Sequence, residues 1–263
     1  MSNYIAKKIF LTFKTVTNPA LFCLDYLGFL KKEIEYKIHS SPWRIIARSG
    51  TPDCREISIV LSGDEYPLKR LPFLNAPIIL DLGAHIGCFS LFAWHHFSGK
   101  NPKIFSIEPD PENFLYLKKN IERNNLQNKD CYLFNCAIGT TNGNGYLDKS
   151  KRNDAYFLSS QPLDQRFVIC QVKTLPKLAS EMHLSKIDIL KMDIEGGEYA
   201  ILEHQESFQF LVDHVRYLLM EYHDRGEGRN GTAIINSLKN HFDLFHHAMN
   251  RILFFKNKSF GNC

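Results

Sequence analysis

Short, continuous apolar runs alternate with longer mixed stretches along most of this 263-residue chain. The clearest runs cover 77–82, 103–108, 187–193 and 215–222. Apolar runs of this length, bounded by polar residues, are typical of strands that are buried on both faces of a parallel sheet. The stretches between them predict helices. The pattern therefore predicts an α/β fold in which helices cover both faces of a mostly parallel, doubly wound sheet.

Further runs and their flanking proline and glycine residues place the other elements. Helices are expected at 86–97, 111–124, 174–183, from Glu198 to near 211, and at 232–241; strands are expected at 131–138 and 167–172. Pro111 suits the first turn of its helix. The polar, glycine-rich stretch 139–166 predicts a hairpin and a loop. The last two runs, 242–247 and 251–255, predict a C-terminal antiparallel hairpin.

The first part of the chain lacks the regular alternation of strands and helices, and its pattern predicts an N-terminal helical arm. We expect helices over 3–16 and 19–33, a short strand within 34–48 and a helix after Thr51. Three prolines between Pro67 and Pro77 then indicate a linker.

We therefore expect the arm with its short strand at 1–70, and a ligand-binding domain at 71–263. Lysines interrupt the apolar residues of the arm, so no run reaches the ~20 residues that a membrane span needs. We expect neither a signal peptide nor a membrane span. Two interpretations of the arm stay open: a helical segment packed on the domain, which we favour, or a basic amphipathic segment in peripheral contact with a membrane.

Composition narrows the class of protein. Hydrophobic residues make up 44% and charged residues 23%, as in ordinary globular proteins. The net charge of +4 comes without a basic cluster, so no nucleic-acid partner is expected. The seven cysteines form no C-x-x-C pair, which argues against a zinc or redox motif and favours a reducing, cytoplasmic setting. The sequence carries no indication of oligomeric state.

The loop after the first predicted sheet strand reads Asp81-Leu-Gly-Ala-His-Ile-Gly87. Gly83 and Gly87 permit a tight turn and the close approach of a ligand to the main chain. The loop lacks the G-x-G-x-x-G spacing of dinucleotide-binding proteins. An acid at position 81 suits an ammonium or sulfonium group better than a pyrophosphate, which favours S-adenosylmethionine over NAD. A glycine corner needed for packing alone is the alternative.

Polar residues follow the next two predicted strands. Glu108 ends the second strand, where a carboxylate can accept hydrogen bonds from both hydroxyls of a ribose. A solvated acid at a strand end is the alternative. Cys136 and Ala137, near the end of the third strand, are candidates to line an adenine slot, although an ordinary strand end explains them equally well.

The fourth and fifth strands carry the candidate catalytic residues. Asp193 and Glu195 fall on one face of the fourth strand end, and Glu221 and His223 on one face of the fifth. If these strands are neighbours, the four side chains converge and supply a general base for a hydroxyl group. The same cluster could hold a divalent metal, but we expect none because the side chains could satisfy one another. Lys191 could pair with a neighbouring acid, and a structural role in a first helical turn is expected for Glu198.

Together these motifs resemble the FkbM family of S-adenosylmethionine-dependent methyltransferases. The resemblance rests on Asp81–Ser90, Ile107–Asn113, Leu117, Asn120, Asn124, Ile187–Glu198 and Glu221–His223, in this order and spacing. It implies a Rossmann-like fold and methyl transfer to a hydroxyl of a sugar, glycan or secondary metabolite. It also implies cofactor contacts for Asp81, Gly83, Gly87 and Glu108, and an active-site position for Asp193, Glu195, Glu221 and His223. This chain has His85 where the family commonly has asparagine, so the expected cofactor contact at position 85 involves a different side chain.

The sequence therefore predicts a methyltransferase that acts on a small-molecule or glycan acceptor. The acceptor pocket is expected to involve 139–166, 224–231 and the N-terminal arm. Two other functions stay open: a NAD-linked oxidoreductase on the same fold, and a non-catalytic scaffold that docks on a membrane.

Overall fold

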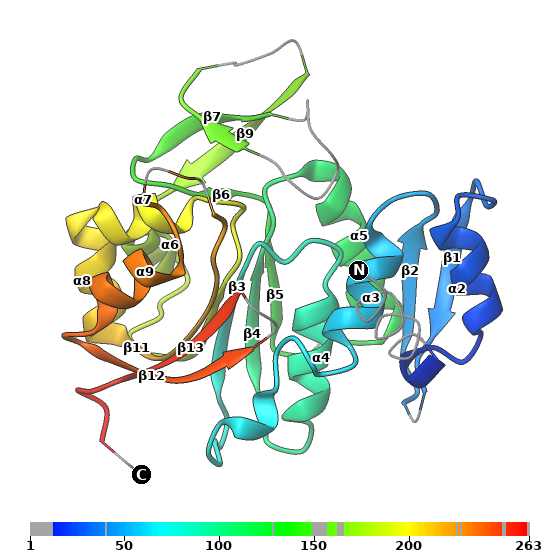
Figure 1. Ribbon diagram of the computed structural model, residues 1–263, viewed down its shortest axis with the longest axis horizontal. Coiled ribbons are helices and arrows are strands. Elements are labelled where there is room, and N and C mark those ends of the chain that lie inside the picture. The colour runs from blue at the N-terminus through cyan, green and yellow to red at the C-terminus, as the bar shows by residue number, and fades with distance from the viewer. Residues whose placement is uncertain are drawn as a thin grey trace.

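The computed structural model describes residues 13–39, 41–127, 129–148, 157–161, 166–224, 226, 228–248 and 251–261. A seven-stranded sheet runs through the centre of these residues, in the order β12-β13-β11-β10-β3-β4-β5 (Figure 1). Its strands are β3 (Ile78–Leu82), β4 (Lys103–Ile107), β5 (Cys131–Phe134), β10 (Ile187–Met192), β11 (Val215–Glu221), β12 (Phe242–Ala248) and β13 (Ile252–Asn257). The first five are parallel, and β12 and β13 form the expected antiparallel hairpin at one edge.

Helices cover both faces of this sheet, as the alternating pattern predicts (Figure 1). One face carries α4 (Cys88–His96) and α5 (Pro111–Arg123); the other carries α6 (Leu175–Glu181), α7 (Glu198–Glu203), α8 (Gln205–His214) and α9 (Gly231–Leu238). Side chains alternate along each buried strand, so Ile79 joins the core on the α4 side whereas Leu80 and Leu82 join the core on the α6 side. This arrangement confirms the doubly wound α/β fold.

The strand order reverses between β3 and β10. From β3 the chain passes outward to β4 and β5, and it then returns to place β10 and β11 on the opposite side of β3. In open parallel sheets of this kind, ligands bind at such a reversal, beyond the carboxyl ends of the strands. The ends of β3, β4, β10 and β11 are therefore the places to look for a site.

The N-terminal segment differs from the expected pair of long helices. Its elements are α2 (Pro19–Tyr26), the antiparallel strands β1 (Glu33–Lys37) and β2 (Arg44–Arg48), α3 (Asp53–Val60) and the short helix η1 (Leu68–Arg70). The expectation of a helix over 19–33 is wrong after Tyr26, because Gly28 adopts a left-handed φ of 76° and ends the helix. Most of the helix expected over 3–16 lies outside the described residues.

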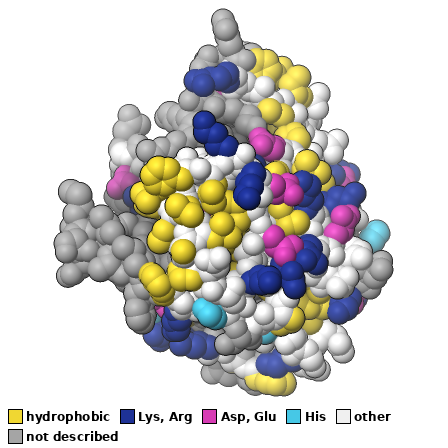
Figure 2. Space-filling view, turned by 90° about the vertical axis from the view of Figure 1, so that its right-hand side faces the viewer, with side chains coloured by type: hydrophobic (Ala, Val, Ile, Leu, Met, Phe, Trp, Pro, Cys, Tyr) yellow, Lys and Arg dark blue, Asp and Glu magenta, His cyan; other side chains and the backbone are white. Residues whose placement is uncertain are grey.

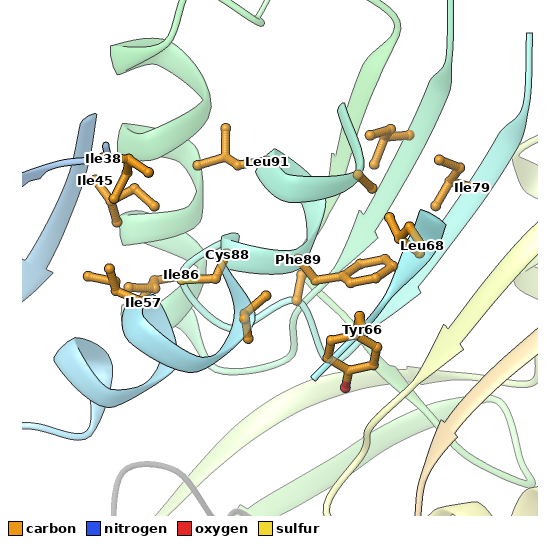
Figure 3. Packing of buried hydrophobic residues seen from close by; sticks show 14 of the residues in the cluster. Ile38, Ile45, Ile57, Tyr66, Leu68, Ile79, Ile86, Cys88, Phe89 and Leu91 are labelled. Carbon is orange, nitrogen blue, oxygen red and sulfur yellow. The ribbon is translucent and has the colours of Figure 1, made fainter. Parts of the chain in front are cut away.

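One hydrophobic core joins this segment to the sheet. Figure 3 shows Ile45 of β2 and Ile57 of α3 in the same cluster as Ile86 and Leu91, which lie beside and within α4. The arm expected at 1–70 thus shares its core with the domain expected to begin at 71, and the boundary between them stays a prediction.

Two asparagines, Asn120 of α5 and Asn124 directly after this helix, hold β2 in place. The Asn120 side chain accepts a hydrogen bond from the Ile46 N–H (2.7 Å) and donates to the carbonyl oxygens of Ile46 (3.0 Å) and Ile86 (2.9 Å). Asn124 likewise accepts from the Arg44 N–H and donates to the Arg44 carbonyl. Both residues belong to the sequence motif described above, and here they tie the N-terminal hairpin to the sheet.

A second, four-stranded sheet stands over the carboxyl ends of the central strands (Figure 1). Its order is β6 (Ala137–Ile138), β9 (Phe167–Lys173), β7 (Gly143–Asp148) and β8 (Phe157–Ser159). The single strand expected over 131–138 is wrong, because the chain leaves the central sheet after Phe134 and enters the second sheet at Ala137. The single helix expected to end near 211 is also wrong: it is divided at His204, whose extended backbone and side-chain cap on Ser207 start α8 anew.

An apolar patch covers the outer surface of the N-terminal segment. Figure 2 views the side on which α2 lies and shows hydrophobic side chains gathered there near basic ones. The exposed apolar side chains on α2 and directly after it, named here the α2 patch, are those of Leu24, Tyr26, Leu27 and Phe29. Within the described part of the chain, no helix has the length and hydropathy to cross a membrane. Peripheral membrane contact stays a prediction, for which the α2 patch is the natural surface.

Candidate active site

A cleft opens at the reversal of strand order, between the ends of β3, β4 and β10 and the second sheet. It encloses about 670 Å³ of empty space, part of it open to solvent. Its lining residues are Gly83, Ile107, Glu108, Pro109, Asn113, Cys136, Ala137, Ile138, Leu147, Leu158, Asp193, Ile194 and Glu195. Six of the residues singled out in the sequence thus share one cleft: Gly83, Glu108, Cys136, Ala137, Asp193 and Glu195.

The loop after β3 is shaped by its contact with the end of β10. Gly83 has a φ of 78°, and a β-carbon at this position would lie 1.8 Å from the main-chain oxygen of Asp193. Only glycine satisfies both conditions. Gly87, with a φ of 94°, packs instead against the Leu117 side chain of α5 and does not line the cleft.

Asp81 lies beneath this loop and is fully buried. Its carboxylate accepts a hydrogen bond from the Ser90 hydroxyl (2.6 Å) and stands 3.3 Å from the Lys191 amine. Asp81 is not part of the cleft lining, so the direct cofactor contact expected of it stays a prediction.

Lys191 connects the loop to the acids at the end of β10. Its buried amine donates to the Gly83 carbonyl oxygen (2.7 Å) and lies 3.5 Å from the Asp193 carboxylate. Burial disfavours the charged amine, but the charges of Asp81 and Asp193 outweigh burial and raise the pKa of Lys191. The expected pairing of Lys191 with a neighbouring acid is confirmed, and its bond to the loop is a feature that sequence spacing does not reveal.

Glu108 stands at the floor of the cleft with 4% of its surface exposed. Its carboxylate accepts hydrogen bonds from the N–H groups of His85 (2.8 Å) and Asp110 (3.0 Å) and from the Asn113 side chain (3.2 Å). Burial is the largest influence and raises the pKa of Glu108 to about 7 despite these bonds. Asn113 also lines the cleft. It lies in the first turn of α5 and was not among the expected site residues.

The far end of the cleft is apolar. Cys136 and Ala137 line it as expected, together with Leu147 of β7 and Leu158 of β8. The two leucines come from the hairpin within the polar stretch 139–166. Their contribution depends on how the second sheet folds back over the first, which the local sequence pattern does not indicate.

His85 turns away from the cleft. Its N–H supports Glu108, but its ring Nε2 lies 3.4 Å from the Asp53 carboxylate of α3, and burial lowers the pKa of the ring. Asp53 in turn receives two hydrogen bonds from the Arg48 guanidinium, both 2.9 Å. The side-chain contact with a cofactor that was expected at position 85 therefore stays a prediction, whereas the main chain of His85 positions Glu108.

Of the four predicted catalytic residues, Asp193 and Glu195, which follow β10, lie beside His223, which follows β11. The Nε2 atom of His223 lies 3.3 Å from a Glu195 oxygen and 3.9 Å from a Asp193 oxygen, and its Nδ1 atom lies 3.2 Å from Glu198. Burial lowers the pKa of His223, but the hydrogen bond to Glu198 and the nearby carboxylates outweigh it and raise this pKa to about 9. Glu198 begins α7 as expected, and its contact with His223 adds a role that its helical position does not predict.

The N-terminal segment adds acids to the same region. Burial, followed by the negative charges of Glu56, Glu221 and Asp193, raises the pKa of Glu65 well above its usual value. Burial and the charge of Asp193 likewise raise the pKa of Glu221. The connection after α3 thus approaches Asp193 and Glu221. The expected contribution of the arm to an acceptor pocket stays a prediction.

Chemically, the cleft joins three unlike surfaces. An apolar slot suits an adenine ring, a buried carboxylate suits ribose hydroxyls, and a cluster of acids suits a positively charged group or a hydroxyl that must lose its proton. The G-x-G-x-x-G loop of dinucleotide-binding proteins is missing from the described turn after β3.

Comparison with known proteins agrees with this arrangement. Residues 81–260 match the methyltransferase FkbM domain. Methyltransferase sdnD of Sordaria araneosa is 29% identical over 181 residues, which cover 56% of this chain and 68% of that protein. Methyltransferase 1 of Beauveria bassiana is 22% identical over 165 residues, 55% of this chain and 65% of that protein.

A solved structure shares the fold. The crystal structure of methyltransferase FkbM from Methylobacillus flagellatus aligns with a TM-score of 0.53 at 20% identity, over 74% of this chain. The alignment covers 47% of that longer protein, so the chain spans about half the length of this structural relative.

Proposed function

Because the chain belongs to the FkbM methyltransferase family, we propose that it transfers a methyl group from S-adenosylmethionine to a hydroxyl of a sugar, glycan or secondary metabolite. The observation that carries the proposal is the shared cleft, which Glu108 lines together with apolar residues and with the acids that follow β10. Family membership supports methyl transfer as the reaction. The choice of hydroxyl acceptors and of the catalytic residues is our inference.

The cleft fits the cofactor on chemical grounds. Glu108 is buried yet lines the cleft, so its carboxylate is available to ribose hydroxyls without a cost of ordering a mobile side chain. Cys136, Ala137, Leu147 and Leu158 provide an apolar surface for the adenine. When bound, the cofactor supplies a methyl group made electrophilic by its sulfonium charge.

Transfer then requires a positioned and deprotonated acceptor. The acceptor oxygen forms a bond to the methyl carbon as the carbon–sulfur bond breaks, and the electron pair of that bond stays on sulfur, which becomes a neutral thioether. The hydroxyl proton passes to a base. We propose that Asp193 or His223 takes this proton and that Glu221 anchors the acceptor; Asp193 is the better placed in the metal-free protein, because the raised pKa of His223 keeps its ring protonated at neutral pH.

A thermal-shift comparison tests the proposal. Each compound that binds the folded protein raises its melting temperature by mass action. We expect S-adenosylmethionine and S-adenosylhomocysteine to raise it in the wild type and to do so much less in Glu108→Ala, while NAD leaves both unchanged. A shift with NAD alone would favour an oxidoreductase, and no shift with any of the three would favour a non-catalytic scaffold.

A further inference from the structure

Three side chains at the acceptor end of the cleft share the geometry of a metal site. Asp193, Glu195 and His223 each present one ligand atom, and these atoms all lie within 4.8 Å of one another. Two carboxylate oxygens and one imidazole nitrogen form a donor set that first-row divalent cations accept. We propose that this group, named here the Asp193–Glu195–His223 site, binds a divalent transition-metal cation such as Mn²⁺ or Zn²⁺.

The orientation of His223 supports this proposal. Its Nδ1 atom faces the carboxylate of Glu198 at 3.2 Å, and Glu198 is fully buried. A second bond, from the Ile194 N–H to the same Glu198 oxygen (3.0 Å), holds that carboxylate in place. A histidine that binds a metal commonly donates its other ring N–H to a carboxylate in this way. Glu198 thereby leaves the Nε2 atom of His223 pointing toward Glu195 and Asp193.

Asp193 provides a separate observation. Its Oδ1 atom is buried and accepts no hydrogen bond from any residue that the structure describes, although the side chain as a whole is 24% exposed. The Nε2 atom of His223 lies 3.9 Å from this oxygen, which is beyond hydrogen-bonding distance. A buried carboxylate oxygen without a donor is costly, and a cation between Asp193 and His223 would satisfy it.

The surrounding charges favour a cation. Lys191 is the nearest competing positive charge, but it lies on the Oδ2 side of Asp193 and is shared with Asp81. Glu221 adds a further acid near Asp193. The region therefore carries more carboxylates than its lysine and histidine neutralise.

The place of the site suggests its use. Asp193 and Glu195 line the cleft, so a cation held by them has open positions facing the acceptor. A hydroxyl bound there has a lowered pKa and releases its proton to water, after which its oxygen is ready to attack the methyl carbon. This catalytic role rests on the proposed function, whereas binding of the cation does not.

Calorimetric titration of the chelator-treated, full-length protein with MnCl₂, and separately with ZnCl₂, tests the site. We expect about one equivalent of at least one ion to bind the wild type. Glu195→Gln, which removes a ligand charge with little change of shape, is expected to weaken that binding at least about 10-fold, and Glu198→Gln by about 10- to 100-fold through the orientation of His223. Glu203→Gln, an exposed acid of α7, is the matched control and is expected to bind like the wild type.

Two results would overturn the proposal: absence of stoichiometric binding of both ions, or unchanged binding of the metal in Glu195→Gln. Titration of the same chelator-treated protein with S-adenosylhomocysteine separates this failure from failure of the proposed function. If only the metal site is wrong, S-adenosylhomocysteine still binds. If the proposed function is wrong, S-adenosylhomocysteine does not bind, whether or not the metal does.

Discussion

A β-carbon at Gly83 would lie 1.8 Å from the main-chain oxygen of Asp193. The loop after β3 and the residue that follows β10 are therefore in direct main-chain contact, although 110 positions separate them in the sequence. Lys191 reinforces this contact by bonding the Gly83 carbonyl and facing the Asp193 carboxylate. A change at Gly83 should consequently disturb both halves of the site.

Gly83→Ala tests this contact, and Gly99→Ala is its matched control. Both glycines have a left-handed φ, 78° and 81°, but a β-carbon at Gly99 meets no atom within 4 Å. We expect Gly83→Ala to weaken S-adenosylhomocysteine binding by at least about 10-fold, equivalent to about 1.4 kcal/mol. Gly99→Ala should lower the free energy of unfolding by about 1 kcal/mol and leave affinity unchanged. Wild-type affinity in Gly83→Ala, measured by calorimetry, would contradict the structure.

Cofactor affinity should depend on pH through Glu108. Burial raises the pKa of this acid to about 7, and its ionised form is the better acceptor for ribose hydroxyls. We expect the affinity for S-adenosylhomocysteine to increase from about pH 6 to about pH 8, as Glu108 loses its proton. Glu108→Gln should bind more weakly and lose this part of the pH dependence; an identical pH profile in the variant would show that another group is responsible.

The same acid affects stability without cofactor. Because the pKa of Glu108 is higher in the folded chain than in the unfolded chain, the folded protein holds more protons between about pH 4.5 and about pH 7. The contribution of Glu108 to the free energy of unfolding therefore falls as pH rises through this window. Urea unfolding across this window measures the free energy of unfolding of the wild type minus that of Glu108→Gln. We expect this difference to fall as pH rises, and a rise would contradict the prediction.

His223 should contribute to turnover and not to cofactor binding. It lies beside Asp193, Glu195 and Glu198 and is not part of the cleft lining. With a methyl acceptor identified, we expect His223→Asn to lower kcat by about 10²-fold, because loss of the ring misplaces Asp193 and Glu195, while S-adenosylhomocysteine affinity stays unchanged. His39→Asn, at an exposed histidine of the N-terminal segment, is the control. A variant that loses cofactor affinity along with turnover would place His223 in the cofactor site instead.

The buried Arg48–Asp53 pair should stabilise the junction between the N-terminal segment and the domain. Asp53 is fully buried, and Arg48 also donates to Asn113 of α5 (2.7 Å). Asp53→Ala leaves the guanidinium without its main partner, which is expected to cost about 3–5 kcal/mol in urea unfolding. Glu35→Ala removes the partly exposed partner of Arg123 and should cost no more than about 1 kcal/mol. Equal losses of unfolding free energy in the two variants would show that the buried pair stabilises the fold no more than the exposed pair does.

The α2 patch should bind anionic membranes. Exposed Lys31 and Lys32 follow its apolar side chains closely in the sequence, a combination that suits a negatively charged lipid surface. We expect the protein to sediment with phosphatidylserine-containing vesicles and much less with neutral ones, and Leu27→Asp with Phe29→Asp to abolish sedimentation. Phe73→Asp, at an apolar residue of similar exposure outside the patch, is the control. Equal sedimentation of all variants would contradict the prediction.

The sequence could predict whatever depends on local pattern. Continuous apolar runs predict the buried strands, so the residues at the strand ends could be identified from the sequence. Among these residues, Gly83, Glu108, Asp193 and Glu195 all line the cleft. Gly28 shows the limit of this approach, because its neighbours have helical character while its own left-handed conformation ends α2.

Features that depend on distant contacts could not be predicted in the same way. The stretch 131–138 is apolar except for Asn135, yet it divides between two sheets because Ala137 and Ile138 pair with β9. Glu198 has the position of an ordinary first-turn acid, and only the return of β11 beside β10 brings His223 to it. Glu65 likewise meets the catalytic acids through the packing of the N-terminal segment.

A crystal structure of the protein with S-adenosylhomocysteine would show whether the cleft is the cofactor site. We expect the ribose hydroxyls to bond the Glu108 carboxylate, the adenine to lie between Cys136–Ile138 and the leucines of the second sheet, and the sulfur to face Asp193. A ligand bound elsewhere, or a cleft filled by Leu147 and Leu158 with the ligand excluded, would contradict this expectation.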